Sequence, residues 1–255
     1  IVFSSNKNKI VELADSSVVL RTGSVGGGQI VARVGGSMGD LYGQGYVRAP
    51  DGQVVYNAST GFALLSTDVV YLGNTIPKGK IGFSNEFQFK GFRLNLLFDA
   101  QYGAVGHSLT HYKMAEQGKL TKTLPGRYNG ITGNGVVYDA VNDKYITNTT
   151  IATDIDEYYR SHFGINNAEG STFSTDFLKF REARLDYSLN PKLTKKLGMQ
   201  RVTVGVYGRD LFIWSDWPAF DPEFGTLSGS DITQGFEVGQ FPSTRTIGFN
   251  LVIGL

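Results

Sequence analysis

The stretch of residues 81 to 102, "IGFSNEFQFKGFRLNLLFDAQY", decides the fold class of this chain. On each side of its central "KG", large apolar residues take every second position and mainly polar residues lie between them. A period of two is typical of β-strands. Because only Lys90 and Gly91 separate the two runs, the pattern predicts a hairpin with a very short turn. The apolar positions are Ile81, Phe83, Phe87 and Phe89 in the first strand and Phe92, Leu94, Leu96, Phe98, Ala100 and Tyr102 in the second.

The same alternation returns in three later stretches: "REARLDYSL" (181–189), "QRVTVGVYGRDLF" (200–212) and "TIGFNLVIGL" (246–255). The first has an ionic polar face, with Glu182, Arg184 and Asp186, which a packed soluble core would not tolerate. Composition points the same way, because 33 Gly, 17 Phe and 13 Tyr against only 7 Pro favour many strands and tight turns. We therefore expect an all-β fold.

The predicted connections alternate in length. Those at 90–91 and 190–199 are short, whereas those at about 103–173 and about 215–243 are long. Connections longer than ~15 residues are uncommon in compact soluble domains, but outer-membrane barrels combine short turns on one side with long loops on the other. Strands of about 9 to 11 residues also match a tilted crossing of a bilayer. The alternation favours a transmembrane β-barrel.

A soluble β-sandwich is the alternative, because its strands also alternate with a period of two. In that case the chain would be a carbohydrate-binding module whose contacts are Trp214, Trp217 and Tyr158. The two hypotheses differ in solubility: the module would be monomeric in buffer, whereas the barrel segment requires detergent and the rest of the barrel.

Both tryptophans lie where the strand that begins at 201 ends. In a barrel, Phe212, Trp214 and Trp217 would lie at the membrane–water boundary, where amphipathic rings form an aromatic girdle. For both tryptophans the alternative is a buried loop anchor, which is strongest for Trp217 because Pro218 follows it directly.

Asp210 conflicts with an unbroken alternation, because it has the same parity as Val206. Either Asp210 lies beyond the hydrocarbon layer, or a β-bulge at Gly208 changes the register.

Charge and composition exclude several functions. Lys and Arg number 24 against 23 Asp and Glu, and a net charge of +1 gives no long-range field to attract nucleic acid. The absence of Cys excludes thiol catalysis, cysteine-bound zinc and disulfides. No nucleophile, base and orienting group can be assembled, so we expect no enzyme, no cofactor and no metal.

Three motifs have ordinary interpretations. His107 and His111 have the spacing of metal ligands on a helix but lack a third ligand, so we expect a solvent-exposed loop pair. "GSVGGGQ" (23–29) lacks the Lys-Ser/Thr of a phosphate-binding loop. The acidic "TDIDEYYR" (153–160) could bind calcium or stack a sugar, but such a cluster is more often a solvated loop surface.

Several stretches together resemble a known family. "STDFLKFREARLDYSL" (174–189), "VGVYGRDLFIWSDWPAFDPEFG" (204–225) and "QFPSTRTIGFNL" (240–251) are similar to the closing part of the SusC/RagA family of TonB-dependent outer-membrane transporters. Earlier stretches, among them "VGGSMGDLYGQGYVRAPDGQVV" (34–55) and "GITGNGVVYD" (130–139), match in the family's order, so the resemblance covers nearly the whole chain.

The resemblance implies that residues 1–255 are the C-terminal portion of a large antiparallel transmembrane β-barrel of about 22 strands when complete. The N-terminal plug and the remaining strands would lie outside this chain. Residues 4–9, 90–91 and 190–199 would be short periplasmic turns, and 215–243 an extracellular loop. The family often ends on an aromatic residue, whereas this chain ends on Leu255.

The implied function is import of oligomeric nutrients, glycans or peptides, across the bacterial outer membrane by a multi-pass barrel. A SusD-like surface lipoprotein and the TonB complex, reached through the missing N-terminal part, would be partners, together with the oligosaccharide or oligopeptide substrate and outer-membrane lipid.

The resemblance also assigns roles to residues. The predicted lumen-facing residues are Arg93, Asn95, Asp99, Glu182, Arg184 and Asp186. The predicted lipid-facing residues are Phe92, Leu94, Leu96, Phe98, Leu185, Tyr187, Ile247, Phe249 and Leu251. The predicted aromatic girdle is Tyr187, Phe212 and Trp214, and the predicted extracellular-loop contacts with substrate or partner are Tyr158, Tyr159, Trp217 and Asp221.

Overall fold

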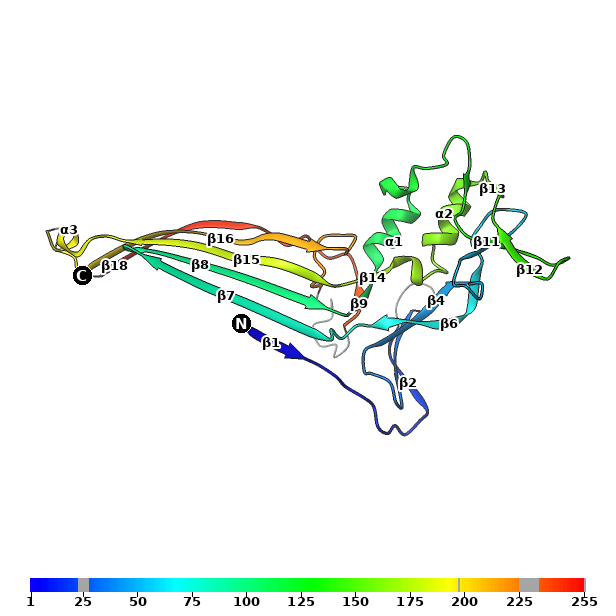
Figure 1. Cartoon of the computed structure of the whole chain (residues 1–255), viewed down its shortest axis with the longest axis horizontal. Helices are drawn as coiled ribbons and strands as arrows, with labels where there is room; N and C mark the ends of the chain where they lie inside the picture. Colours follow the sequence, from blue (N-terminus) through cyan, green and yellow to red (C-terminus); the bar gives the residue numbers. More distant parts are fainter. Residues whose placement is uncertain (23–27, 197, 225–233, 255) are drawn as a thin grey trace.

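The computed structural model describes residues 1–22, 28–196, 198–224 and 234–254. Its main element is a six-stranded antiparallel sheet, here called the long sheet, which extends along the long axis of the molecule (Figure 1). Its strands lie side by side in chain order: β1 (Val2–Ser5), β7 (Gly79–Phe89), β8 (Phe92–Tyr102), β15 (Phe177–Ser188), β16 (Arg201–Ser215) and β18 (Thr246–Gly254). The expected all-β, antiparallel class is confirmed.

Short connections lie at one end of the long sheet. Lys90 and Gly91 have φ values of +46° and +89°, and two residues with positive φ form the tight hairpin turn that was predicted. The other short connection, between β15 and β16, contains the helix α3 (Pro191–Lys196). We call this end the turn end.

Three long connections lie at the opposite end and together form what we call the loop region: residues 6–78, 103–176 and 216–245. The first of them corrects an expectation. Ser5 pairs with Gly79, where β7 begins, and the Asn6 amide donates to the Lys78 carbonyl at 3.2 Å. Residues 4–9 therefore lead into a long connection at the loop end and do not form a short turn beside 90–91.

β-Bulges keep the apolar residues on one face of the long sheet. Two neighbouring rows across the sheet show the bulges: one is Leu96, Ala183 and Gly208, and the next is Phe98, Phe180 and Phe212. The two rows are two residues apart in β8, three in β15 and four in β16. Asp210, with φ +50°, lies in the extra length of β16. The predicted bulge exists, then, but two residues beyond Gly208, and it returns Phe212 and Trp214 to the face of Val206.

Short strands join the three long connections to one another. The sheets of the loop region are β2 (Ser17–Thr22), β3 (Gln29–Arg33), β4 (Asp40–Tyr46) and β6 (Leu65–Asn74); β5 (Val55–Tyr56), β11 (Val136–Asp139) and β12 (Lys144–Thr147); β9 (Val105–Ser108), β14 (Thr172–Ser174) and β17 (Phe236–Glu237); and β10 (Ile131–Thr132) with β13 (Ile151–Ala152). β5 pairs with β11 and β17 pairs with β9, so each of the outer two connections is tied to the middle one.

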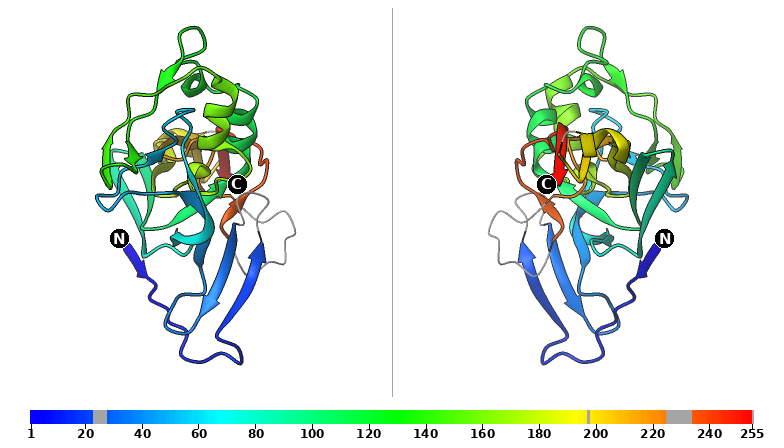
Figure 2. Two further views of the ribbon diagram at one scale, coloured as in Figure 1. Left: turned by 90° about the vertical axis from the view of Figure 1, so that its right-hand side faces the viewer. Right: turned by 90° about the vertical axis from the view of Figure 1, so that its left-hand side faces the viewer.

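Two helices in the middle connection were not predicted (Figure 2). The Ser108 hydroxyl accepts from the His111 amide at 3.0 Å and caps α1 (Leu109–Glu116). The Asp154 carboxylate accepts from the Glu157 amide at 3.1 Å and caps α2 (Ile155–Phe163). Two 3-10 turns, η1 (Thr121–Thr123) and η2 (Glu169–Ser171), flank these helices.

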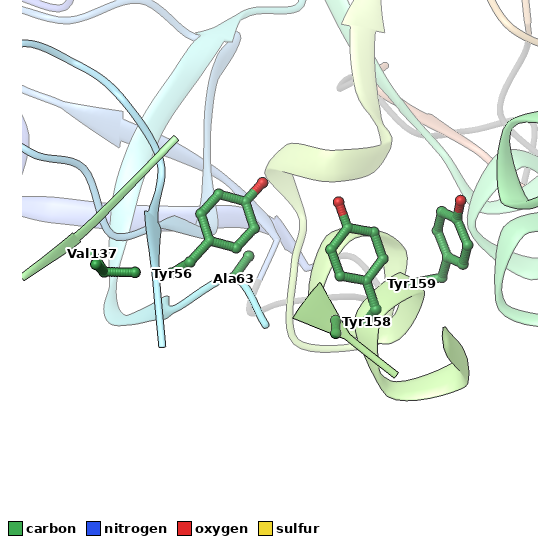
Figure 3. Close-up of a cluster of buried hydrophobic side chains, with 6 residues drawn as sticks. Tyr56, Ala63, Val137, Tyr158 and Tyr159 are labelled. Carbon is green, nitrogen blue, oxygen red and sulfur yellow. The ribbon is translucent and has the colours of Figure 1, made fainter. Parts of the chain in front are cut away.

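The hydrophobic cores lie in the loop region. One is formed by Tyr56, Ala63, Val137, Ala152, Tyr158 and Tyr159 (Figure 3). A second joins Ile30 and Leu41 of the first connection to Phe236 of the third. Within the described ranges, no helix is both long and apolar enough to cross a membrane.

Candidate functional site

The long sheet has one face of exposed apolar side chains, here called the apolar face. On β18, Phe249 is 83% exposed, Ile247 is 74% exposed and Leu251 is 62% exposed. Neighbouring strands continue the face through aromatic pairs, with ring centroids 4.5 Å apart for Phe98 and Phe180. A β-sandwich would bury such a face against a second sheet, so these exposures argue against that alternative.

The structure brings all nine predicted lipid-facing residues onto the apolar face. Register places Phe92 beside Tyr187, Leu94 beside Leu185, and the β16 valines beside the apolar residues of β18. Their contact with a bilayer stays a prediction.

The predicted girdle residues also lie on the apolar face, at its two ends. Tyr187 lies near the turn end, with its ring 4.6 Å from that of Phe92. Phe212 and Trp214 lie near the loop region, stacked at 5.9 Å and each more than half exposed. The buried-anchor alternative is therefore wrong for Trp214. The rings occupy two levels, as two membrane interfaces would require.

The opposite face, here called the polar face, carries all six predicted lumen-facing residues. Register places Arg93 beside Asp186, Asn95 beside Arg184, and Asp99 beside Lys179. Arg184 and Asp186 form an ion pair of 2.7 Å. A hollow of about 410 Å³ near the turn end is lined by Arg93, Arg184, Asp186 and Arg201, so cations predominate there. The lumen-facing role of these residues remains a prediction.

Gly205 allows two polar side chains to meet on the polar face. Asp186 on β15 and Asn250 on β18 pair with Gly205 from opposite sides. A Cβ on Gly205 would lie 2.0 Å from an Asp186 carboxylate oxygen and 2.3 Å from the Asn250 amide oxygen. The absent side chain is thus what leaves room for both groups over β16.

A cluster of charges attaches the third long connection to the polar face. The Lys179 side chain is only 3% exposed, and its ammonium lies 2.6 Å from Asp221 and also contacts Glu223. Arg181 lies 2.7 Å from Asp99 and 2.6 Å from Glu223. Because a buried cation requires paired anions, this cluster fixes residues 221–223 against the sheet.

Lys179, Arg181 and Glu223 were not among the residues predicted from the sequence. Arg181 is an extra residue that forms a bulge in β15, so Lys179 lies on the polar face. Strict alternation from Ala183 would have placed Lys179 on the apolar face. The signal that could have found the cluster is the pair of acids around Pro222, in the same connection as Trp217.

The predicted extracellular-loop contacts are largely buried. Tyr158 and Tyr159 are 6% and 9% exposed within the first core, and the Tyr159 hydroxyl donates to the Pro125 carbonyl at 2.9 Å. Trp217 is 7% exposed and its ring stacks 5.0 Å from Phe224, so it is an anchor of the loop region. Asp221 belongs to the charge cluster. That these residues contact substrate or a partner stays a prediction.

The two histidines are not an exposed loop pair, because both are buried. His107 lies on β9 and burial lowers its pKa to about 4. His111 lies on α1, where burial and the nearby Lys122 ammonium lower its pKa to about 3. Its ring nitrogens lie 2.9 Å from the Ser171 hydroxyl and 2.8 Å from the Lys122 ammonium. The described residues contain no group of three potential metal ligands.

Glu237 joins the third connection to the start of α1. Burial would raise its pKa, but hydrogen bonds from Thr110 and Ser108 outweigh burial and lower it. The Ser108 and Thr110 hydroxyls lie 2.7 and 2.6 Å from the Glu237 carboxylate.

Residues 23–27 of the glycine-rich motif, residues 225–233 of the third connection, and Leu255 lie outside the described residues.

The acidic motif at 153–160 begins α2. Asp156 and Glu157 lie in its first turn, where negative charge interacts favourably with the positive end of the helix dipole. Both carboxylates are at least half exposed and contact Arg160. The expected solvated surface is therefore present, but on a helix.

Comparisons with known proteins agree with this geometry. No protein-family model matches the chain. Among curated proteins of Formosa agariphila, it is 24% identical to TonB-dependent receptor P3 over 280 residues, which covers 98% of this chain and 26% of that protein. It is 26% identical to TonB-dependent receptor P26 over 282 residues, with the same coverage. The chain spans about a quarter of the length of these relatives.

Solved structures of the RagAB peptide importer share the fold. The "open-open" state of that importer matches with a TM-score of 0.62 and 14% identity, covering 99% of this chain and 26% of the matched chain. A structure of the RagAB peptide transporter matches with a TM-score of 0.63 and 16% identity, covering 97% of this chain and 26% of the matched chain.

The long sheet is therefore a segment of a large antiparallel β-barrel, with short turns at one end and long loops at the other. Over nearly its whole length the chain is similar to TonB-dependent receptors, and it shares the fold of the solved RagAB structures, as the resemblance seen in the sequence leads one to expect.

Proposed function

We propose that this chain is one part of a TonB-dependent importer of oligomeric nutrients in the bacterial outer membrane. The apolar face contacts outer-membrane lipid, the polar face lines the lumen, and the loop region lies outside the cell. The N-terminal plug belongs to the rest of the polypeptide and receives energy from TonB.

The observation that carries this proposal is the pair of contrasting faces on the long sheet. Large apolar side chains are exposed on the apolar face, among them Phe87, Leu185 and Phe249, while Arg93, Asp99, Arg184 and Asp186 lie on the other. Strands of a transmembrane barrel alternate in this way because one face contacts lipid and the other contacts water.

The relatives support transport in preference to catalysis, since they are named receptors and importers. RagAB is called a peptide importer, which favours a peptide substrate for this protein, and a glycan is the alternative. The partner follows from the resemblance to the SusC/RagA family: we propose that a SusD-like surface lipoprotein contacts the loop region of this protein.

Deletion of the full-length gene tests the proposal in the native bacterium. We expect the protein in the outer-membrane fraction, and loss of uptake of a labelled oligopeptide or oligosaccharide when the gene is deleted or a protonophore is added. Affinity purification should also recover a lipoprotein. A soluble protein, or uptake unchanged by deletion, would contradict the proposal.

Variants of the polar face sharpen the test. Replacing both Arg93 and Arg184 with Gln should reduce uptake while the amount of protein in the membrane stays constant. Replacing both Lys7 and Lys119 with Gln is the matched control, because it removes two charges from exposed side chains outside the long sheet. Equal uptake by the two variants would show that the polar face does not line the path.

A further inference from the structure

We propose that the long sheet carries a phospholipid site near its turn end: an apolar groove holds an acyl chain, and the lysines of α3 bind the phosphate headgroup. The inference rests on the proposed function, because it requires the apolar face to lie in a membrane.

The groove is a hollow of about 570 Å³ on the apolar face. Its floor is formed by Val204 and Val206 on β16, which are shorter than their neighbours. Phe92 and Tyr187 rise on one side, and Phe249 rises on the other. The side chains that line it are almost wholly apolar, so the groove fits a hydrocarbon chain better than a peptide or a sugar, whose polar groups would find no partners.

The groove leads toward α3. In register, the row of Tyr187, Val204 and Leu251 is followed toward the turn end by the pair of Val202 and Ile253. Val202 is only 7% exposed, unlike Val204 and Val206, and α3 packs against β16. Figure 1 shows α3 at the tip of the sheet opposite the loop region.

The charge around α3 is strongly positive. Its exposed side chains include Lys192, Lys195 and Lys196. No acidic residue occurs between Asp186 and Asp210 in the sequence. Among the residues that the structure describes, none forms an ion pair with these three lysines. Clusters of basic residues at the edge of a membrane attract anionic lipids.

The two features together identify the occupant as a lipid. An apolar groove alone would accept any hydrocarbon, and basic residues alone would accept any phosphate. A phospholipid carries both chemistries, with its phosphate at the membrane surface and its chains along the protein wall. Anionic phosphatidylglycerol should therefore bind more tightly than zwitterionic phosphatidylcholine.

The experiment uses the full-length transporter that contains this chain, extracted from the outer membrane in a mild detergent. Native mass spectrometry counts retained phospholipid, and titration with phosphatidylglycerol or phosphatidylcholine gives the affinities. Wild-type protein should retain phospholipid and prefer phosphatidylglycerol. The triple variant Lys192→Gln, Lys195→Gln and Lys196→Gln should bind phosphatidylglycerol about a hundredfold more weakly.

Two further variants separate the groove from the charges. Val206→Trp should fill the groove and reduce retention of both lipids equally. The triple control Lys7→Gln, Lys9→Gln and Lys119→Gln removes the same charge from exposed positions in the loop region and should bind like the wild type. Inorganic phosphate should not displace the lipid.

The outcomes distinguish this inference from the proposed function. Protein in the outer membrane without retained phospholipid would overturn the site alone, as would equal binding by the two triple variants. Displacement by inorganic phosphate would mean an ion site without an acyl chain. Protein absent from the outer membrane would overturn both the proposed function and the lipid site.

Discussion

The long sheet and the loop region use the same residue types in opposite ways. In the loop region, Tyr56, Tyr158 and Leu41 are almost fully buried. On the long sheet, Trp214 and Phe249 are more than half exposed. A folded protein in water buries large apolar side chains, so the exposed side chains of the long sheet are what the proposed function requires of a region that faces lipid. The loop region, in contrast, has hydrophobic cores of its own.

The largest expected effect tests the core of the loop region. Tyr158→Ala should destabilise that region by about 3–5 kcal/mol, because truncating a buried aromatic leaves a cavity. Hydrogen exchange of the full-length protein should show faster exchange in α2 and β5 and unchanged exchange in β7 and β8. Tyr128→Ala is the control, since that ring is 98% exposed. Equal effects of the two variants would mean that the loop region has no core of its own.

The next prediction tests the apolar face. Leu251→Arg should impair barrel assembly by about 2–4 kcal/mol, because a charge on the lipid-facing side must enter hydrocarbon. The measurement is folding into lipid vesicles followed by denaturant titration. Ser84→Arg places the same charge on the polar face and should cost little. If Ser84→Arg proved the more damaging, the two faces would be assigned the wrong way round.

A smaller effect is expected at Gly205. Gly205→Ala should destabilise the sheet by about 1–3 kcal/mol, because the added methyl overpacks against Asp186 and Asn250. Gly82→Ala is a matched control, since a Cβ there would lie 4.0 Å from Val2 and meets nothing closer. The two variants are compared by the midpoint of their thermal unfolding in detergent. Equal midpoints would show that Gly205 is not needed to make room for Asp186 and Asn250.

The smallest effect concerns pH. His107 has a folded-state pKa of about 4, below its usual 6.5, because burial disfavours the charged form. The unfolded state then binds more protons, so the contribution of His107 to stability is present above pH 6.5 and is lost as pH falls toward 4. Between pH 7 and 6 this loss is about 0.7 kcal/mol per buried histidine.

His107→Gln should remove one histidine's share of that pH dependence. Hydrogen exchange in α1, measured at pH 7 and pH 6, gives the comparison, and the exchange of the long sheet supplies the internal control. An unchanged pH dependence in the variant would show that the pKa of His107 is the same in the folded and unfolded states, as for a solvated imidazole.

The sequence could predict the parts of the fold that depend on a regular period. The hairpin of β7 and β8, the two faces and the alternating connection lengths follow from side chains that repeat every second residue. One bulge was anticipated at Asp210, where an acid broke the parity. The extra residue at Arg181 left a similar signal, because strict alternation from Ala183 would place Arg181 and Lys179 on the apolar face, but that signal does not show at which residue the register changes.

The loop region could not be predicted because its structure depends on contacts between distant segments. β5 and β17 are two residues long and gain their partners only from other connections. α2 did carry a local signal, since Asp154 is followed three residues later by Glu157, as at many helix starts. The burial of Tyr158 and Trp217 likewise arises from tertiary packing.

The pairing of strands between the three long connections has a consequence for the order of folding. β5 pairs with β11, and β9 pairs with β17, so the first connection waits for the second and the second waits for the third. The third connection leads directly into β18, the last strand of the long sheet. The loop region can therefore reach its final structure only when the sheet is nearly complete. A half-assembled sheet would expose its unfinished loops, and a cell could distinguish it from the finished protein by that difference alone.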